Sequence, residues 1–173
     1  MKTPRYFTEA DLQAIKKANS FKELYIIAEA ILKKMPERTV GVCDPLSTSH
    51  VQDNLVIFNK TIEALLDKGI AVFNEIPFEE KITELKEQWF VENKESDKKH
   101  CAPLIEDFFK PLLESKKITK LILLPNWQDK YLSYWEDSYA VRHNIPTVAL
   151  PLDWTDHYNV EKVPSLGTLQ TSN

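Results

Sequence analysis

One carboxylate in this chain occupies a position from which it could take part in bond-making chemistry. Glu136 falls in a helical stretch that follows the apolar run 121–124. It shares one stripe of that helix with Leu132, Ala140 and His143, and Trp135 and Tyr139 stand beside the stripe. A carboxylate there is either the nucleophile that cleaves an N-glycosidic bond or an ordinary surface or ion-paired glutamate. Spacing alone favours the ordinary glutamate.

Further candidate residues gather in loops that follow expected strands. The loops are 44–50, 74–77 and 126–131. The carboxyl ends of parallel strands meet at one edge of a sheet, which is where open α/β sheets bind ligands. We therefore expect a cleft that Glu136 faces. Its candidate substrate-binding residues are Asp44, Ser47, Thr48, Asn74, Asn126, Trp127 and Trp135.

The aromatic residues of this set favour a flat ligand. Trp127 and Trp135 offer ring faces on which the base of a nucleoside or nucleotide can stack. Packing in a hydrophobic core is the alternative role for each ring taken alone.

Several other kinds of site are excluded by the sequence. Its three glycines form no phosphate-binding loop. Cys43 and Cys101 make neither a disulfide framework nor a metal-ligand pattern, and buried structural thiols are expected instead. No Ser–His–Asp or Cys–His arrangement is evident. We expect no metal and no cofactor.

Composition bounds the class of protein. The 173 residues suit one domain, and 43% hydrophobic residues suffice for a full core. A net charge of −4 argues against binding to a nucleic-acid polymer. No apolar run is long enough for a membrane span and no signal peptide is evident, so a cytoplasmic protein that avoids membranes is expected.

The elements that must hold these residues alternate along the chain. Strands are predicted at 39–43, 70–73, 121–124 and 145–150. Helices are predicted at 51–68, 78–92 and 103–115 and around Glu136, where Lys130, Ser133, Asp137 and Asn144 fall on a polar stripe. This alternation predicts an α/β fold with a parallel sheet of about four or five strands.

Two further helices are predicted before the first strand. Thr8 and Asp11 resemble a capping box that opens a helix to about Ala18, and Ser20 can cap a second one. Pro111 should kink the 103–115 helix or limit its length. Residues 1–38 are thus an N-terminal helical extension, residues 39–163 the α/β domain and residues 164–173 a flexible tail.

Three blocks, in order, resemble the nucleoside 2-deoxyribosyltransferase-like family, which includes deoxynucleoside monophosphate N-glycosidases. The first is Gly41-Val-Cys-Asp-Pro-Leu-Ser-Thr48, and the second runs from Asn54 through Gly69 to Val72-Phe73-Asn74. The third is Leu123-Leu124-Pro125-Asn126-Trp127, with Glu136 nine positions after the tryptophan. The resemblance implies a flavodoxin-like three-layer sandwich and a homo-oligomer. It also implies that Glu136 attacks C1′ of a 2-deoxyribosyl group.

Two departures from the family pattern leave an alternative open. Asp44 and Leu132 stand where family members usually have glycine. A carboxylate at position 44 would repel an anionic substrate, and a leucine at 132 adds bulk one turn before Glu136. The alternative is a non-catalytic nucleotide-binding or regulatory protein that kept the fold and lost the reaction.

Overall fold

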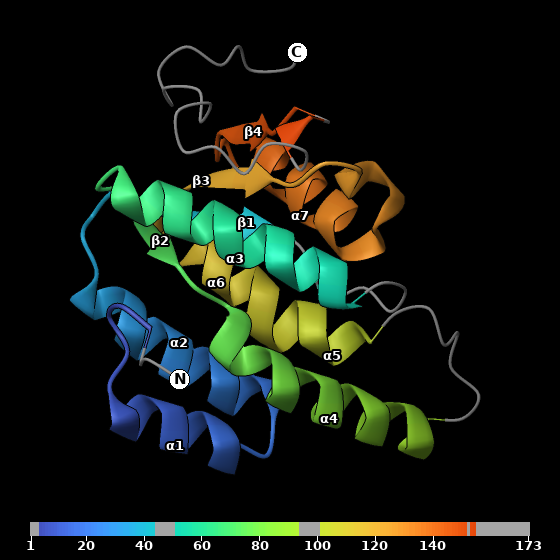
Figure 1. The fold of residues 1–173 in the computed structure, drawn as a ribbon. Helices are drawn as coiled ribbons and strands as arrows, with labels where there is room; N and C mark the ends of the chain where they lie inside the picture. The colour runs from blue at the N-terminus through green and yellow to red at the C-terminus, as the bar shows by residue number, and fades with distance from the viewer. Residues whose placement is uncertain (1–3, 44–50, 94–100, 152, 155–173) are drawn as a thin grey trace. The chain divides into compact units, whose positions relative to one another are not determined.

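The computed structural model describes residues 4–43, 51–93, 101–151, 153 and 154. The chain divides into two compact units, each assembled from two stretches of sequence (Figure 1). The helical unit comprises Met1–Pro36 and Asn74–Lys117. The sheet unit comprises Glu37–Phe73 and Ile118–Asn173.

This division does not coincide with the predicted one, because the helices before the first strand group with residues 74–117. Compactness alone does not show which stretches fold independently. The boundaries at 38 and 163 therefore stay a prediction. The predicted tail, 164–173, lies outside the described residues.

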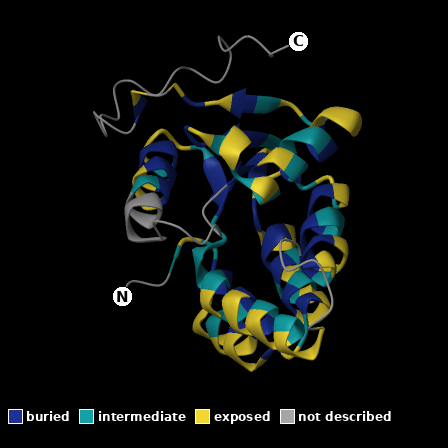
Figure 2. Ribbon diagram, turned by 90° about the vertical axis from the view of Figure 1, so that its right-hand side faces the viewer, coloured by how far each residue is buried: buried dark blue, intermediate teal, exposed yellow. Residues whose placement is uncertain are grey.

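The sheet of the sheet unit is parallel. Within the described residues its strands follow the order β2-β1-β3-β4. They are β1 (Thr39–Cys43), β2 (Ala71–Phe73), β3 (Ile118–Leu123) and β4 (Thr147–Ala149). Cys43 at the end of β1 is in register with Leu123 of β3, which is in register with Ala149 of β4. Every residue of β1 is buried, as expected for a central strand covered on both faces (Figure 2).

Two helices connect these strands. Helix α3 (Val51–Asp67) joins β1 to β2, and α7 (Tyr131–Arg142) joins β3 to β4. The two crossovers move in opposite directions across the sheet, so right-handed connections put their helices on opposite faces. Figures 1 and 2 show α3 and α7 on opposite faces of the sheet. The predicted α/β fold is confirmed, and the strand order agrees with the flavodoxin-like order over these strands.

Gly69 ends α3, as predicted. Its φ of 76° is a left-handed conformation that costs a residue with a side chain about 1–2 kcal/mol. The Gly69 N–H donates to the carbonyl of Leu66 at 2.9 Å, and the Ile70 N–H donates to that of Leu65 at 3.0 Å. These bonds satisfy carbonyls at the helix end and turn the chain into β2.

One buried hydrogen bond ties the residues after β4 to α3. The indole N–H of Trp154 donates to the hydroxyl of Thr61 at 2.8 Å, and that hydroxyl donates to the carbonyl of Ile57 at 2.9 Å. Trp154 is 5% exposed and Thr61 is 1% exposed. Trp154 therefore packs on the α3 side of the sheet.

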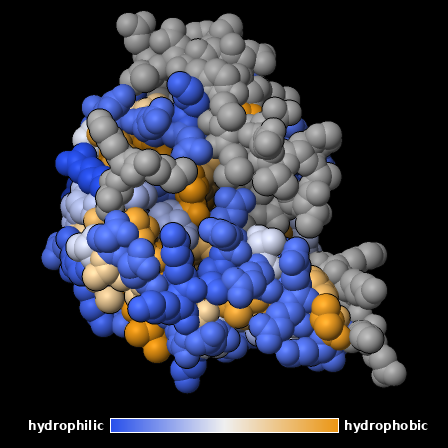
Figure 3. All heavy atoms as spheres, turned by 60° about the horizontal axis from the view of Figure 1, so that its bottom comes forward, coloured by the Kyte–Doolittle hydropathy of each residue, from blue (hydrophilic) through white to orange (hydrophobic). Residues whose placement is uncertain are grey.

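The helical unit is built around a phenylalanine cluster. Its helical segments are α1 (Glu9–Lys17), α2 (Phe21–Lys34), α4 (Ile76–Glu92), α5 (Ala102–Leu104), a π-helix (Ile105–Phe109) and α6 (Lys110–Glu114). Phe78 of α4 packs against Phe7 and Phe108, with ring centroids 6.1 and 5.6 Å apart. Figure 3 shows mostly hydrophilic side chains on the face turned forward, with the hydrophobic ones scattered.

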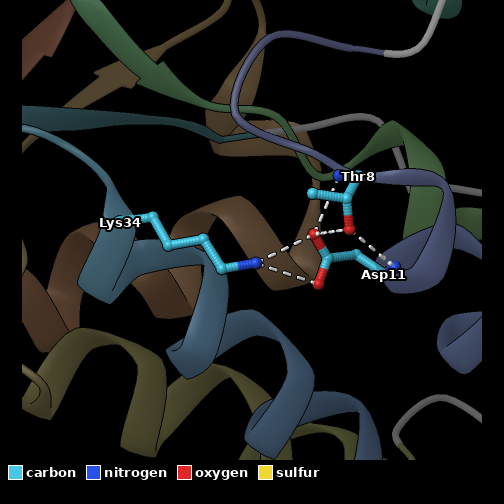
Figure 4. Close-up of polar contacts among 3 residues, drawn as sticks. All are labelled: Thr8, Asp11 and Lys34. Atoms are coloured by element: carbon cyan, nitrogen blue, oxygen red, sulfur yellow. Dashed lines mark hydrogen bonds and ion pairs between the residues drawn. The ribbon is translucent and has the colours of Figure 1, made fainter.

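The predicted caps of the first two helices are confirmed. Thr8 accepts from the Asp11 N–H at 3.2 Å, and the Asp11 carboxylate accepts from the Thr8 N–H at 2.8 Å (Figure 4). The same carboxylate pairs with Lys34 of α2 at 3.1 Å. Ser20 caps α2 by accepting from the Glu23 N–H at 3.2 Å. Asp11 therefore stabilises the start of α1 and joins it to the end of α2.

Three other expectations about element bounds are wrong in detail. Strand β3 begins at Ile118, three residues before the predicted 121–124 run. Helix α4 begins at Ile76 and not at Phe78. The predicted 103–115 helix contains a π turn, in which the N–H of Lys110 reaches the carbonyl of Ile105. This wider turn directly precedes Pro111, whose ring would clash with a carbonyl of a regular α-helix.

Candidate functional site

The strand order puts a candidate ligand-binding edge between the two central strands of the sheet. From β1 the chain moves to β2, and from β3 it moves the opposite way to β4. The connections that follow Cys43 and Leu123, which are in register, therefore lead to opposite edges of the sheet. Open α/β sheets bind ligands in the crevice outside the carboxyl ends of such strands. Residues 124–136 belong to this edge, while the loop after β1 lies outside the described residues.

The loop after β3 is a tight turn. Leu124 and Pro125 are buried, and Asn126 is exposed with a left-handed φ of 62°. The N–H of Trp127 donates to the carbonyl of Leu124 at 3.2 Å, and that of Lys130 donates to the carbonyl of Trp127 at 3.1 Å. Asn126 tolerates this conformation better than most residues with a side chain. The turn leaves Trp127 half-buried at the start of a 3-10 turn, η2 (Trp127–Asp129).

Glu136 lies on the buried face of α7, the helix that follows this turn. Its exposed fraction is 3%, and those of Ser133 and Ala140 are 1% and 0%. Burying a carboxylate costs free energy unless polar or charged groups surround it, and Glu136 does have an interaction partner. Glu136 is therefore an internal carboxylate near the ligand-binding edge and not a solvated surface residue.

The predicted division of α7 into an apolar and a polar stripe is wrong in two places. Ser133 was expected on the polar stripe and is buried, whereas His143 was expected on the apolar stripe and is exposed. Leu132 is half-buried. Large hydrophobic side chains also occupy the outer face of the helix, where Tyr134 is 56% exposed and Val141 is 61% exposed. Apolar residues on both faces weaken the periodicity from which a buried face is predicted.

An aromatic column runs along α7 beside Glu136. Trp135 stacks on Tyr139 with ring centroids 5.0 Å apart and an angle of 26° between the planes. Tyr139 stacks on His143 at 4.0 Å and 12°, and Nδ1 of that histidine lies 2.8 Å from the Tyr139 carbonyl. One face of Trp135 is thus occupied within the helix. Only its opposite face is left for stacking on a base.

Asn74 has a local role that its sequence position did not reveal. Its side-chain oxygen accepts from the N–H of Ile76 at 3.0 Å, which opens α4 next to Pro77. Asn74 groups with the helical unit. A helix-opening role accounts for this side chain without a ligand.

The structure thus brings part of the predicted set into the sheet unit. Asn126, Trp127, Trp135 and Glu136 all lie on the turn after β3 or on α7. Asp44, Ser47 and Thr48 lie outside the described residues. Ser133 is a buried residue of this helix face that the predicted stripes did not include. Its spacing of three positions from Glu136 was the available signal, because residues three apart are neighbours on a helix surface.

Neither thiols nor metal ligands add to this site. Cys43 and Cys101 are both buried, as expected, and neither is in a disulfide. Burial raises the pKa of the Cys101 thiol, which keeps it protonated and unreactive at neutral pH. Across the described ranges, no three His, Cys, Asp or Glu residues gather in a way that would hold a metal ion.

Comparisons with other proteins identify no relative, so any assignment of function depends on the residues described above. In the part of the chain that the structure describes, no helix has both the length and the apolar character that crossing a membrane requires. Comparison with protein-family models, with curated proteins and with solved structures gave no match.

Proposed function

We propose that this protein is an N-glycosidase or deoxyribosyltransferase that acts on a nucleoside or nucleotide through Glu136. The burial of that carboxylate on the inner face of α7, in the turns that follow β3, carries the proposal. A carboxylate buried near the ligand-binding edge of a parallel sheet contributes little to solubility, so another role is inferred for it. The sequence resemblance assigns a nucleophile to the same residue.

The reaction follows from what a carboxylate can do at an anomeric carbon. An oxygen of Glu136 forms a bond to C1′ while the C1′–N bond breaks, and the electron pair of that bond leaves with the base, which takes up a proton. Water then attacks C1′ of the glycosyl ester and releases the sugar with a free carboxylate. In a transferase a second base replaces the water.

Other residues of the sheet unit would bind the substrate. Trp127 and the face of Trp135 opposite Tyr139 suit the base, and the exposed Asn126 amide can bond to a polar edge of it. Ser47 and Thr48 remain proposed contacts to the sugar or phosphate, and Asp44 remains a proposed contact to the substrate. The contact expected of Asn74, which groups with the helical unit, stays a prediction. Neither a metal nor a cofactor is needed for these steps.

Base release tests the proposal. The purified chain is incubated with common nucleosides and their 5′-monophosphates, and free base is measured by chromatography. The proposal predicts release by the wild type and a loss of at least about a hundredfold in Glu136→Gln, since removing a nucleophile costs several kcal/mol of transition-state stabilisation. Asp137→Asn is the matched control, because it neutralises the adjacent, half-buried carboxylate of the same helix. Equal activity of wild type and Glu136→Gln would exclude the mechanism.

The burial of Glu136 favours a second function, in which the protein binds a nucleotide without turnover. Only 3% of Glu136 is exposed, and Leu132 stands half-buried one turn before it. A substrate can reach the carboxylate only if its neighbours move, whereas a binding protein needs no such access. This function predicts a higher melting temperature with nucleotide and no release of base.

Oligomeric state and location are two further expectations from the sequence. A homo-oligomer follows from the resemblance alone, and sedimentation of the full chain tests it. A cytoplasmic location likewise stays a prediction.

A further inference from the structure

Ser133 stands apart among the buried polar residues of the described chain. These residues are Thr39, Thr61, Ser133 and Glu136, each no more than 3% exposed. Thr61 forms two hydrogen bonds, and Thr39 and Glu136 also take part in interactions. Within the described ranges the Ser133 hydroxyl has no hydrogen-bond partner. Buried hydroxyls are nearly always bonded, so one without a partner in the free protein is a candidate to bind a ligand.

Its position on α7 relates this hydroxyl to Glu136. Residues three apart on a helix lie on the same face, with Cβ atoms about 5–6 Å apart. Ser133 is the third residue of α7, so it lies closer than Glu136 to the turn after β3. The helix rises about 4.5 Å between the two residues, at 1.5 Å for each. Ser133 is therefore on the same buried face, one step nearer the ligand-binding edge.

We propose that the Ser133 hydroxyl binds the 3′-hydroxyl of the furanose whose C1′ meets Glu136, an inference that rests on the proposed function. In a β-nucleoside the base lies on one face of the sugar and the 3′-hydroxyl on the other. A nucleophile that displaces the base approaches the face carrying the 3′-hydroxyl. Two side chains about 5–6 Å apart on one helix face can contact C1′ and this hydroxyl together.

The chemistry of serine suits this contact. A serine hydroxyl donates one hydrogen bond and accepts others, as the sugar hydroxyl does. A buried group left without a partner penalises a ligand that lacks the matching hydroxyl, so Ser133 would select against 3′-deoxy sugars. The competing explanation is packing, in which Ser133 is merely a small residue where α7 approaches the sheet. Packing predicts no dependence on the ligand.

Two substrates and two variants separate these explanations. Base release is measured as kcat/KM for 2′-deoxynucleosides and their 2′,3′-dideoxy counterparts, with wild type, Ser133→Ala and Ser138→Ala. Ser138 is a half-buried serine of the same helix, so its variant controls for loss of a hydroxyl from α7. We expect Ser133→Ala to lose about tenfold on the deoxynucleoside and nothing on the dideoxynucleoside, as fits one hydrogen bond. Ser138→Ala should match wild type on both.

The melting temperature of the free protein gives a readout independent of activity. Removing a hydroxyl that has no partner should leave the melting temperature of Ser133→Ala equal to or above that of wild type. A fall of several degrees, or an equal loss of kcat/KM on both substrates, would overturn the role of Ser133 while leaving Glu136 untouched. If the wild type neither binds nor cleaves any nucleoside tested, the proposed function fails and this assignment fails with it.

Discussion

Replacing Thr61 by valine should destabilise the protein by about 1–3 kcal/mol, the cost of a buried donor left without an acceptor. The Trp154 indole N–H donates to Thr61 at 2.8 Å, and both residues are at least 95% buried. Valine keeps the shape of threonine and removes the oxygen. No water can replace that oxygen unless the packing opens, so the indole N–H stays unpaired.

Urea unfolding followed by far-ultraviolet circular dichroism measures this loss, because the secondary-structure signal does not depend on the tryptophan. Thr61→Ser is the matched control. It keeps the hydroxyl and removes one methyl group, which costs about 0.8 kcal/mol. Combining Thr61→Val with Trp154→Phe should recover about 1 kcal/mol relative to the sum of the single changes, because no unpaired group then remains.

The stability of Thr61→Val tests whether the hydrogen bond between Trp154 and Thr61 forms. If Thr61→Val is as stable as the wild type, or if the double variant shows no coupling, Trp154 does not bond to α3. The path of the chain after β4 would then differ from the one described, and the α3 side of the sheet would lack this cover.

Two further predictions concern the helix ends. Partial burial acts to raise the pKa of Asp11, but the Thr8 hydrogen bonds and Lys34 outweigh it and hold the pKa below the ordinary value of 3.8. The stability from this lowered pKa is complete well above pH 3.8 and is lost as the pH falls through the lowered pKa. Asp11→Asn should therefore lower the free energy of unfolding, measured in urea, by about 1 kcal/mol at pH 7 and by less at pH 3. An equal loss at both pH values would refute the charge effect. Gly69→Ala should cost about 1 kcal/mol, because φ is 76° and a Cβ there meets nothing within 4 Å, and Gly69→Asn should cost less; equal stabilities would contradict the conformational argument.

Local signals predicted the parts of the fold that local interactions determine. The caps at Thr8 and Ser20 and the stop at Gly69 depend on neighbouring backbone groups, so a few residues of sequence were enough. The start of β3 was missed because Thr119 and Lys120 precede its apolar run. Lys120 joins the sheet in register with Val40 of β1, and Thr119 lies at a register shift where its hydroxyl donates to the carbonyl of Thr39 at 3.1 Å.

The candidate site was predicted less completely, and its misses have physical causes. Contact with β3 and β4 determines which face of α7 is buried. Because the outer face also carries apolar residues, the sequence pattern did not show which face that would be. Ser133 was therefore assigned to the wrong side. Asn74 has a local role that was not predicted. Its side chain opens α4, and the ligand contact suggested by its position after a strand stays a prediction.

The intact mass of the protein during turnover tests the central claim most directly. The wild type is mixed with a cleaved 2′-deoxynucleoside, quenched in acid within milliseconds to seconds, and analysed by mass spectrometry and peptide mapping. The nucleophilic role of Glu136 predicts a transient increase of one deoxyribosyl group on the peptide that contains this residue, absent in Glu136→Gln and present in Asp137→Asn. A deoxyribosyl group on another residue, or base release by Glu136→Gln at the wild-type rate, would contradict it.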